Sequence, residues 1–112
     1  METTNKKSQK FSTEEFIGKY LNKITGSDIE PVGKIVSVFK NILTLHPVKH
    51  ELITKMDFQI GGFAAHCSNN DDQEYNYTVD ETQTFEMNFS KSMLKNGYYI
   101  SDKPKYFYDY NF

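Results

Sequence analysis

Apolar residues in the first part of the chain recur at spacings of three and four, which is the period of an amphipathic helix. A capping sequence at Ser12 and a stop at Gly26 predict a first helix over residues 12–26. A second helix is predicted over residues 31–46. Its apolar stripe consists of Val32, Ile35, Val36, Phe39, Ile42 and Leu43. Phe39 lies at the centre of the stripe and is therefore expected in the core.

From residue 51 onward the apolar residues alternate with polar ones, which is the period of a half-buried strand. The predicted strands cover residues 52–60, 63–67, 75–79, 85–89 and 98–100, and the aromatic segment 106–112 can continue the last of them. Polar turns are predicted between them, at 68–72 and 95–97. Alternation turns Phe85, Met87 and Phe89 inward and leaves Glu86 and Asn88 facing outward.

Helices first and hairpin-linked strands afterwards predict an α+β domain, with N-terminal helices packed on an antiparallel sheet. Residues 1–10 are polar and are expected to form a disordered tail, so residues 11–112 are expected to form one domain. A chain of 112 residues has room for a single core.

The charge pattern argues against direct nucleic-acid binding, since the net charge is −2 and all thirteen basic residues are lysines. Cys67 is the only cysteine, which excludes an internal disulfide and favours a reducing compartment. The first ten residues lack the apolar segment of a signal peptide, and no apolar run approaches the ~20 residues of a membrane span. We therefore expect a cytoplasmic or nuclear protein without membrane contact.

The residues with catalytic or metal-binding chemistry do not form a familiar motif. His46 and His50 flank Pro47 and cannot share a regular helix, so no metal site and no cofactor are predicted. His66 and Cys67 are neighbours on a strand and point to opposite faces, which argues against a catalytic pair. No catalytic residue is predicted.

Two acidic features have alternative interpretations. Asp57 lies between apolar residues and can be a general acid or base in an apolar pocket, or it can face solvent beside Lys55 and Gln59. The acidic stretch 69–74 lacks the glycine and closing glutamate of a calcium-binding loop, which favours a solvated turn.

The C-terminal region is unusually rich in aromatic residues. They are Tyr98, Tyr99, Tyr106, Phe107, Tyr108, Tyr110 and Phe112. Such a set exceeds what one edge of a small core normally absorbs, and exposed Tyr and Phe often mark a protein interface. Both roles, core and interface, remain open at this point.

Three stretches together resemble the nuclear transport factor two family: residues 35–59 with Leu45-His46-Pro47, residues 85–89, and residues 99–106 with Asp102-Lys103-Pro104-Lys105-Tyr106. The continuation over residues 107–110 is similar to the small subunit of the heterodimeric mRNA export receptor. This resemblance implies a cystatin-like cone, in which a strongly bent antiparallel sheet wraps around the N-terminal helices.

The resemblance also implies a function. We expect a non-catalytic module that heterodimerises with the larger subunit of the export receptor and supports mRNA export at nuclear pores, where nucleoporins are further partners. It is therefore expected in the nucleus, at the pore and in the cytoplasm. Lys105 is expected to meet a carboxylate of the partner. The full set of expected partner-binding residues is Glu86, Asn88, Lys103, Lys105, Tyr108 and Tyr110.

Two other functions are compatible with the same resemblance. One is a homodimeric carrier of Ran-GDP, for which Asp80 is the best-placed acidic contact. The other is a small-ligand binder or an enzyme that uses the pocket of the cone, with Asp57 and a histidine as the acid–base pair, since fold alone does not settle function.

Overall fold

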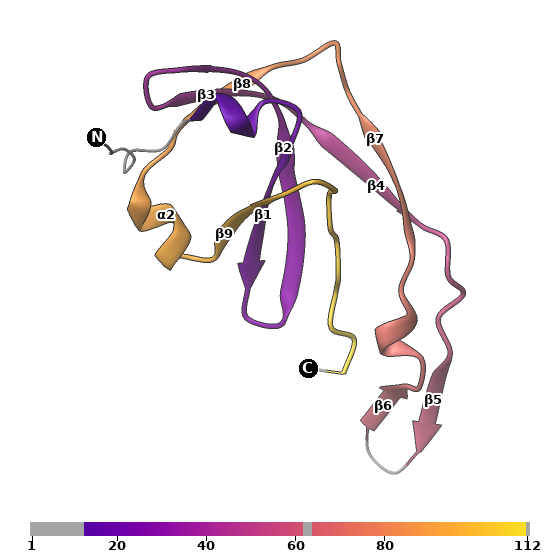
Figure 1. Cartoon of the computed structure of the whole chain (residues 1–112). Coiled ribbons are helices and arrows are strands. Elements are labelled where there is room, and N and C mark those ends of the chain that lie inside the picture. Colours follow the sequence, from indigo (N-terminus) through magenta and orange to yellow (C-terminus); the bar gives the residue numbers. More distant parts are fainter. Residues whose placement is uncertain (1–12, 62–63, 112) are drawn as a thin grey trace.

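The computed structural model describes residues 13–61 and 64–111 and is built mostly of antiparallel sheet, with half of the described residues in strands (Figure 1). The elements in chain order are η2 (Thr13–Phe16), β1 (Tyr20–Thr25), β2 (Asp28–Phe39), β3 (Ile42–His46), β4 (Val48–Leu52), β5 (Phe58–Gly61), β6 (Ala64–Cys67), η3 (Asn70–Asp72), β7 (Tyr75–Val79), β8 (Phe85–Asn88), α2 (Lys91–Lys95) and β9 (Tyr98–Ser101). The molecule is elongated, with principal extents of 63 × 31 × 19 Å.

The predicted α+β fold is wrong. The regions 12–26 and 31–46, expected to be helices, are occupied by η2 and strands β1 to β3, and no N-terminal helix packs on a sheet in the described part of the chain. The helix-filled cone implied by the family resemblance is therefore absent. The expected tail 1–10 and the expected cap Ser12 lie outside the described residues.

Two β-bulges explain why β2 imitates a helix in the sequence. The register of β2 shifts at Val32 against β1 and at Val36 against β3, so each site adds one unpaired residue. As a result Val32, Ile35 and Val38 all pack on the same core, although they are spaced by three and not by two. A strand with regularly placed bulges therefore carries the helical period in its apolar residues.

The hairpin turns have a similar effect on the sequence pattern. Gly26, expected to end a helix, lies in the two-residue turn between β1 and β2 with a positive φ of 61°. Lys40 follows the end of β2 with a φ of 56° and begins the turn into β3. Phe39 consequently lies beside this turn with 69% of its surface exposed, so its predicted place in the core is wrong.

The core lies on one face of a five-stranded sheet with the order β8-β3-β2-β1-β9. The buried cluster consists of Leu21, Ile35, Leu43, Leu45, Phe89 and Met93. Residues of both edge strands pack against this one cluster, Phe85 and Met87 from β8 and Tyr98 and Ile100 from β9. The sheet must therefore curve around the core, and α2 covers it between the two edges with Met93 pointing inward.

Beyond the sheet, the chain forms a long projecting hairpin that we call the arm, made of β4, β5, β6, η3 and β7 (Figure 1). β4 pairs with β7, and β5 pairs with β6, so the arm continues the β3–β8 hairpin away from the core. A two-stranded ribbon of this kind buries little apolar surface, and Leu52, Ile53 and Phe58 are exposed. The arm therefore needs support from another part of the chain.

The second half of the sequence was predicted more accurately. Strands form at or near the expected ranges at 64–67, 75–79, 85–88 and 98–101, although Phe63 lies outside the described residues. The single strand expected over 52–60 is wrong, because β4 ends at Leu52, β5 begins at Phe58 and residues 53–57 lie in no strand. Phe89 is buried, and Phe85 and Met87 pack against the core while Glu86 and Asn88 are exposed, as alternation predicted. Among the described helices, none has the length and apolar character needed to cross a membrane.

Candidate functional site

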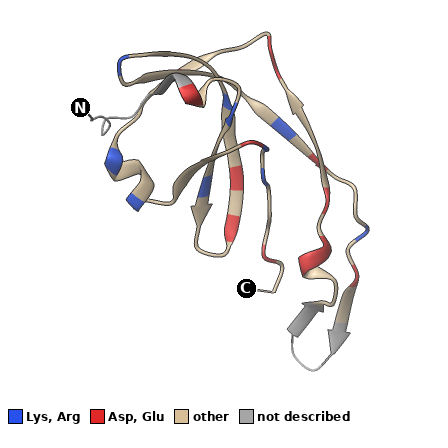
Figure 2. Ribbon diagram, in the orientation of Figure 1, with Lys and Arg blue, Asp and Glu red and all other residues tan. Residues whose placement is uncertain are grey.

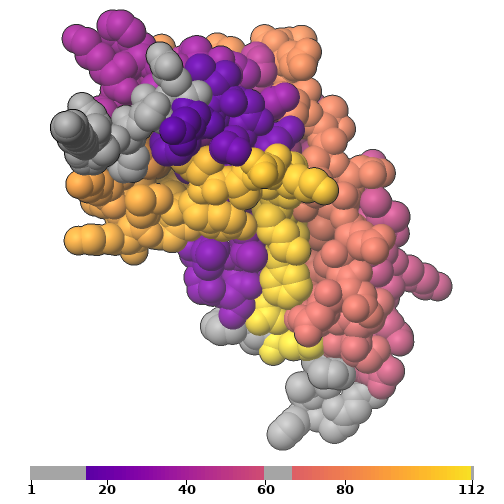
Figure 3. Space-filling view, viewed as in Figure 1, coloured from indigo at the N-terminus to yellow at the C-terminus, as the bar shows by residue number. Residues whose placement is uncertain are grey.

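The support for the arm comes from the segment after β9, residues 102–111, which we call the tail. The tail is not a strand, and only Phe107 forms a β-bridge, with Ile29 of β2. It runs between the β1–β2 hairpin and the arm, as the yellow segment of Figure 3 shows. The surrounding elements hold the tail by hydrogen bonds to its backbone, and side chains make most of these bonds.

Every backbone N–H group from residue 105 to residue 111 donates a hydrogen bond. The acceptors, in order along the tail, are Asn22 Oδ1 (3.1 Å), Tyr77 Oη (2.7 Å), the carbonyl of Ile29 (2.8 Å), Gln73 Oε1 (3.2 Å), Asp28 Oδ1 (2.9 Å), Asn70 Oδ1 (3.0 Å) and Asp109 Oδ1 (3.0 Å). The amide of Asn111 donates in turn to the carbonyl of Cys67 (2.9 Å). We call this set of bonds the clamp, and it fixes the tail in one position against the arm.

The clamp brings aromatic rings of the tail against rings of the arm, and we call the resulting row the aromatic strip. It consists of His50, Phe58, Tyr75, Tyr77, Tyr106, Tyr108 and Tyr110. Tyr106 stacks on His50 with ring centroids 3.7 Å apart, and it meets Tyr75 edge to face at 4.9 Å. Tyr110 contacts Phe58 at 5.2 Å and Tyr108 at 4.9 Å, both edge to face. These are favourable geometries for aromatic pairs.

Two phenols of the strip that belong to the arm, Tyr75 and Tyr77, have raised pKa values. Burial is the largest cause that raises the pKa of Tyr75, followed by the nearby Tyr110 and Tyr106, and together they bring it to about 12. Burial also raises the pKa of Tyr77, against a smaller lowering by its hydrogen bond from the N–H of Tyr106. Tyr75 and Tyr77 therefore act as apolar and hydrogen-bonding surfaces at neutral pH.

The raised pKa of Tyr75 predicts an alkaline weakening of the fold. Because the folded state keeps this proton longer than the unfolded state, the stabilisation is complete below pH 10, the ordinary value, and is lost as the pH rises through about 12. We expect the free energy of unfolding to fall less steeply over this window in Tyr75→Phe, measured by denaturant titration at stepped pH. Equal slopes for parent and variant would contradict the assignment.

Two hollows lie beside the tail, each of about 330 Å³. The first is lined by Lys23, Thr25, Asp28, Ile29, Glu30, Tyr106, Phe107 and Tyr108. The second is lined by Cys67, Ser68, Asn69, Asn70, Asp71, Asp72 and Asn111. In the second, Asn70 and Asn111 take part in the clamp, and Asn69 Oδ1 lies 3.4 Å from Cys67 Sγ.

The structure separates the residues that were expected to bind a partner. Glu86 and Asn88 lie on β8, at one edge of the five-stranded sheet. Lys103 and Lys105 follow β9 at the other edge, and both are exposed, but neither belongs to a strand. The geometry that was assumed for Lys105, on a last strand facing a partner, is therefore absent. Tyr108 and Tyr110 are the members of this set that lie in the aromatic strip.

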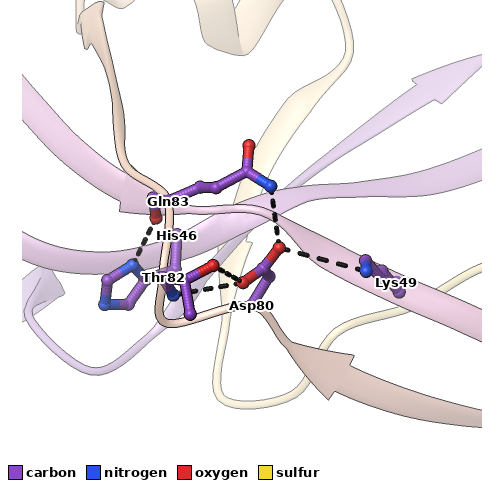
Figure 4. Close-up of polar contacts among 5 residues, drawn as sticks. All are labelled: His46, Lys49, Asp80, Thr82 and Gln83. Atoms are coloured by element: carbon purple, nitrogen blue, oxygen red, sulfur yellow. Dashed lines mark hydrogen bonds and ion pairs between the residues drawn. The ribbon is translucent and has the colours of Figure 1, made fainter.

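Asp80 lies in the turn that joins β7 to β8, where its carboxylate is occupied by nearby donors (Figure 4). It accepts hydrogen bonds from the hydroxyl of Thr82 (2.6 Å) and the amide of Gln83 (2.9 Å), and Lys49 lies 3.9 Å away. The bonds from Thr82 are the main cause of the lowered pKa of Asp80. His46 Nδ1 meets the carbonyl of Gln83 at 2.7 Å in the same turn. This arrangement stabilises a turn, and the Ran-GDP contact stays an untested prediction.

Asp57 is exposed, which matches its solvent-facing alternative, and its carboxylate accepts a hydrogen bond from the hydroxyl of Ser68 at 3.0 Å. Cys67 is buried and contacts Asn69 and Asn111. In residues 13–61 and 64–111, no group of three or more His, Cys, Asp or Glu side chains is arranged to hold a metal ion.

Sequence reasoning missed the clamp almost entirely. The buried amide of Asn22 is central to it, because it donates to Ser101 Oγ (2.8 Å) while its oxygen accepts from Lys105. Gln73 contributes both an acceptor and a donor to Tyr108. The one local signal was Asn22 directly after the apolar Leu21, since a buried amide requires polar partners.

No protein-family model, no curated protein and no solved structure matches this chain. The resemblance to the nuclear transport factor two family therefore stays a prediction from short stretches of sequence.

Proposed function

We propose that this chain is a non-catalytic protein-binding module that holds a partner polypeptide against the aromatic strip of the arm and tail. The observation that carries the proposal is the joined run of rings, in which Phe58 is 52% and Tyr108 46% exposed while Tyr110 contacts both. Single exposed apolar residues are ordinary on a protein surface, but adjoining exposed rings are typical of an interface.

The clamp makes this surface well suited to binding. An interface that is already ordered loses less conformational freedom when a partner docks, which improves affinity. The backbone beneath Tyr108 is held on both sides, because its N–H donates to Gln73 and its carbonyl accepts from the same side chain. The exposed rings are thus presented by a fixed backbone and not by a free terminus.

The family resemblance adds specific partners that the geometry does not support in its own right. The expected heterodimer with the export receptor and the Ran-GDP alternative were both inferred from a family whose fold is a cone filled by N-terminal helices. The described residues do not form such a cone. The enzyme alternative depended on a pocket inside the same cone. What supports partner binding here is the aromatic strip, whatever the identity of the partner.

Paired alanine variants test the proposal. We expect Phe58→Ala and Tyr108→Ala each to weaken capture of specifically bound proteins by about thirtyfold, since truncation of a central aromatic residue typically costs about 2 kcal/mol or more at an interface. The measurement is quantitative affinity capture from extract with the tagged chain as bait, followed by titration of the captured protein against the purified variants.

Phe39→Ala is the matched control, because Phe39 is also an exposed aromatic residue but lies at the turn between β2 and β3, away from the arm. Its capture should equal that of the parent, and all variants should keep the circular dichroism spectrum of the parent. The aromatic strip would not be the binding surface if Phe58→Ala and Tyr108→Ala both capture the partner like the parent. The same conclusion would follow if Phe39→Ala loses as much capture as these two variants.

A further inference from the structure

We infer that the hollow between β2 and the tail binds a basic side chain, lysine or arginine, presented by a partner polypeptide. The inference rests on the proposed function, because Tyr108 belongs both to the aromatic strip and to the lining of this hollow. It goes further by stating the chemistry of the partner. The hollow, of about 330 Å³, has room for the end of a long side chain.

The lining combines carboxylates with aromatic rings. Asp28 and Glu30 of β2 lie on one side, and Tyr106, Phe107 and Tyr108 of the tail lie on the other. A cation gains from both kinds of wall, by Coulomb attraction to the carboxylates and by attraction to the electron-rich faces of the rings. The alkyl stem of lysine or arginine can at the same time pack on apolar ring surface.

The two carboxylates have no cation of their own in the described chain, where neither forms an ion pair. Lys23, also in the lining, is the cross-strand neighbour of Glu30, but its ammonium lies over the ring of Tyr98, 4.9 Å from the centroid. The lining therefore holds two negative charges against one positive charge that is engaged elsewhere.

The pKa of Tyr106 reports the same negative field. Burial raises it first and Tyr110 next, and then both Asp28 and Glu30 raise it further, which requires the carboxylates to lie close to the phenol. Acidic positions outnumber basic ones along β2, η3 and the end of the tail (Figure 2), and Asp109 of the tail donates its N–H to Asp28 of the lining. This field attracts a basic segment and repels an acidic one.

The clamp preforms the hollow. Phe107 exchanges two backbone hydrogen bonds with Ile29, each of 2.8 Å, which joins the aromatic wall to the strand that carries the carboxylates. Asp28 also accepts the N–H of Asp109. The walls are thus fixed relative to each other before any ligand arrives, and a cation loses little affinity to rearrangement of the site.

The test is amide chemical-shift mapping by NMR on the full chain. The probes are the N-acetyl methylamides of lysine and arginine, with the N-acetyl methylamide of norleucine as an uncharged match of the lysine stem. We expect saturable shifts at the amides of Ile29, Glu30 and Phe107 with the two basic probes and none with norleucine. Glu30→Gln should weaken binding of the basic probes about fivefold, and added salt should weaken it in the parent.

Glu30 is chosen because its side chain is exposed and, unlike that of Asp28, takes no part in the clamp. Glu86→Gln on β8 is the matched control and should bind the probes like the parent. Equal shifts with norleucine, no saturable shifts with any probe, or unchanged affinity in Glu30→Gln would each overturn the inference. Phe58→Ala separates this result from the proposed function, because Phe58 lies outside the lining: it should lose partner capture and keep probe binding.

Discussion

Leu45→Ala is expected to lower the free energy of unfolding by about 3–4 kcal/mol, because it leaves a cavity in the fully buried core. Leu45 lies on β3 between β2 and β8 and packs in the cluster with Leu21, Ile35 and Leu43. Both neighbouring strands are hydrogen-bonded to β3, so the site cannot collapse easily to fill the space. A domain of this size has only about 5–15 kcal/mol of stability, and the variant should be marginal.

Phe39→Ala is the control that shows whether the loss of stability at Leu45 depends on its burial. The sequence pattern assigned Phe39 to the core, and truncation there would then cost as much as at Leu45. The structure leaves 69% of Phe39 exposed, so we expect a loss of under about 1 kcal/mol. Chemical denaturation of both variants is the measurement, and equal losses would show that the strand assignment of β2 is wrong.

Gly97→Ala is expected to destabilise the domain by about 3 kcal/mol or more. Gly97 has a φ of 97°, which costs a residue with a side chain about 1–3 kcal/mol, and a Cβ there would lie 2.3 Å from the carbonyl oxygen of Ile24. That oxygen belongs to the backbone of β1 and cannot move without disturbing the hydrogen bond from Ile24 N–H to the carbonyl of Gly97. We therefore expect Gly97→Ala to weaken the contact of β9, and of the tail that follows it, with β1.

Gly26→Ala provides the control, because Gly26 also has a positive φ, of 61°, but a Cβ there would meet nothing within 4 Å. Gly26→Ala should lower the free energy of unfolding only by the cost of a side chain at positive φ, about 1–2 kcal/mol. Thermal and denaturant unfolding measure both, and hydrogen exchange at the amides of 105–111 should quicken in Gly97→Ala alone. Equal effects of the two changes would mean that the close approach of Gly97 to β1 does not exist.

The error over the N-terminal half has a definite physical origin. A helix and a strand with two bulges can both place apolar residues three apart, and Val32 and Ile35 satisfy either pattern. The β-branched residues of this stretch fit a strand better than a helix, which was the propensity signal that the spacing overrode. Pro31 is also tolerated here because it lies next to a bulge in β2.

The candidate site could be predicted only in part. The aromatic density of the C-terminal segment indicated an interface or a core, and the structure divides it: Tyr98 packs on the core, whereas Tyr108 and Tyr110 form part of the aromatic strip. Phe58, the ring partner of Tyr110, comes from the arm, and nothing in the local sequence joins these segments. The inward and outward sides of β8 were predicted correctly, but β8 lies at an edge of the five-stranded sheet and not in the strip.

The sequence by itself determined the features that depend on near neighbours: the alternating strands from residue 64 onward, the turn at Gly97, and the inward side of β8. Only the tertiary structure decided the rest. The clamp joins residues as far apart as Asn22 and Lys105, 83 positions along the chain, and the hollow joins β2 to the tail. Local periodicity carries no information about such pairs, because the contacts form only when separate segments with compatible hydrogen-bonding groups meet in the folded chain.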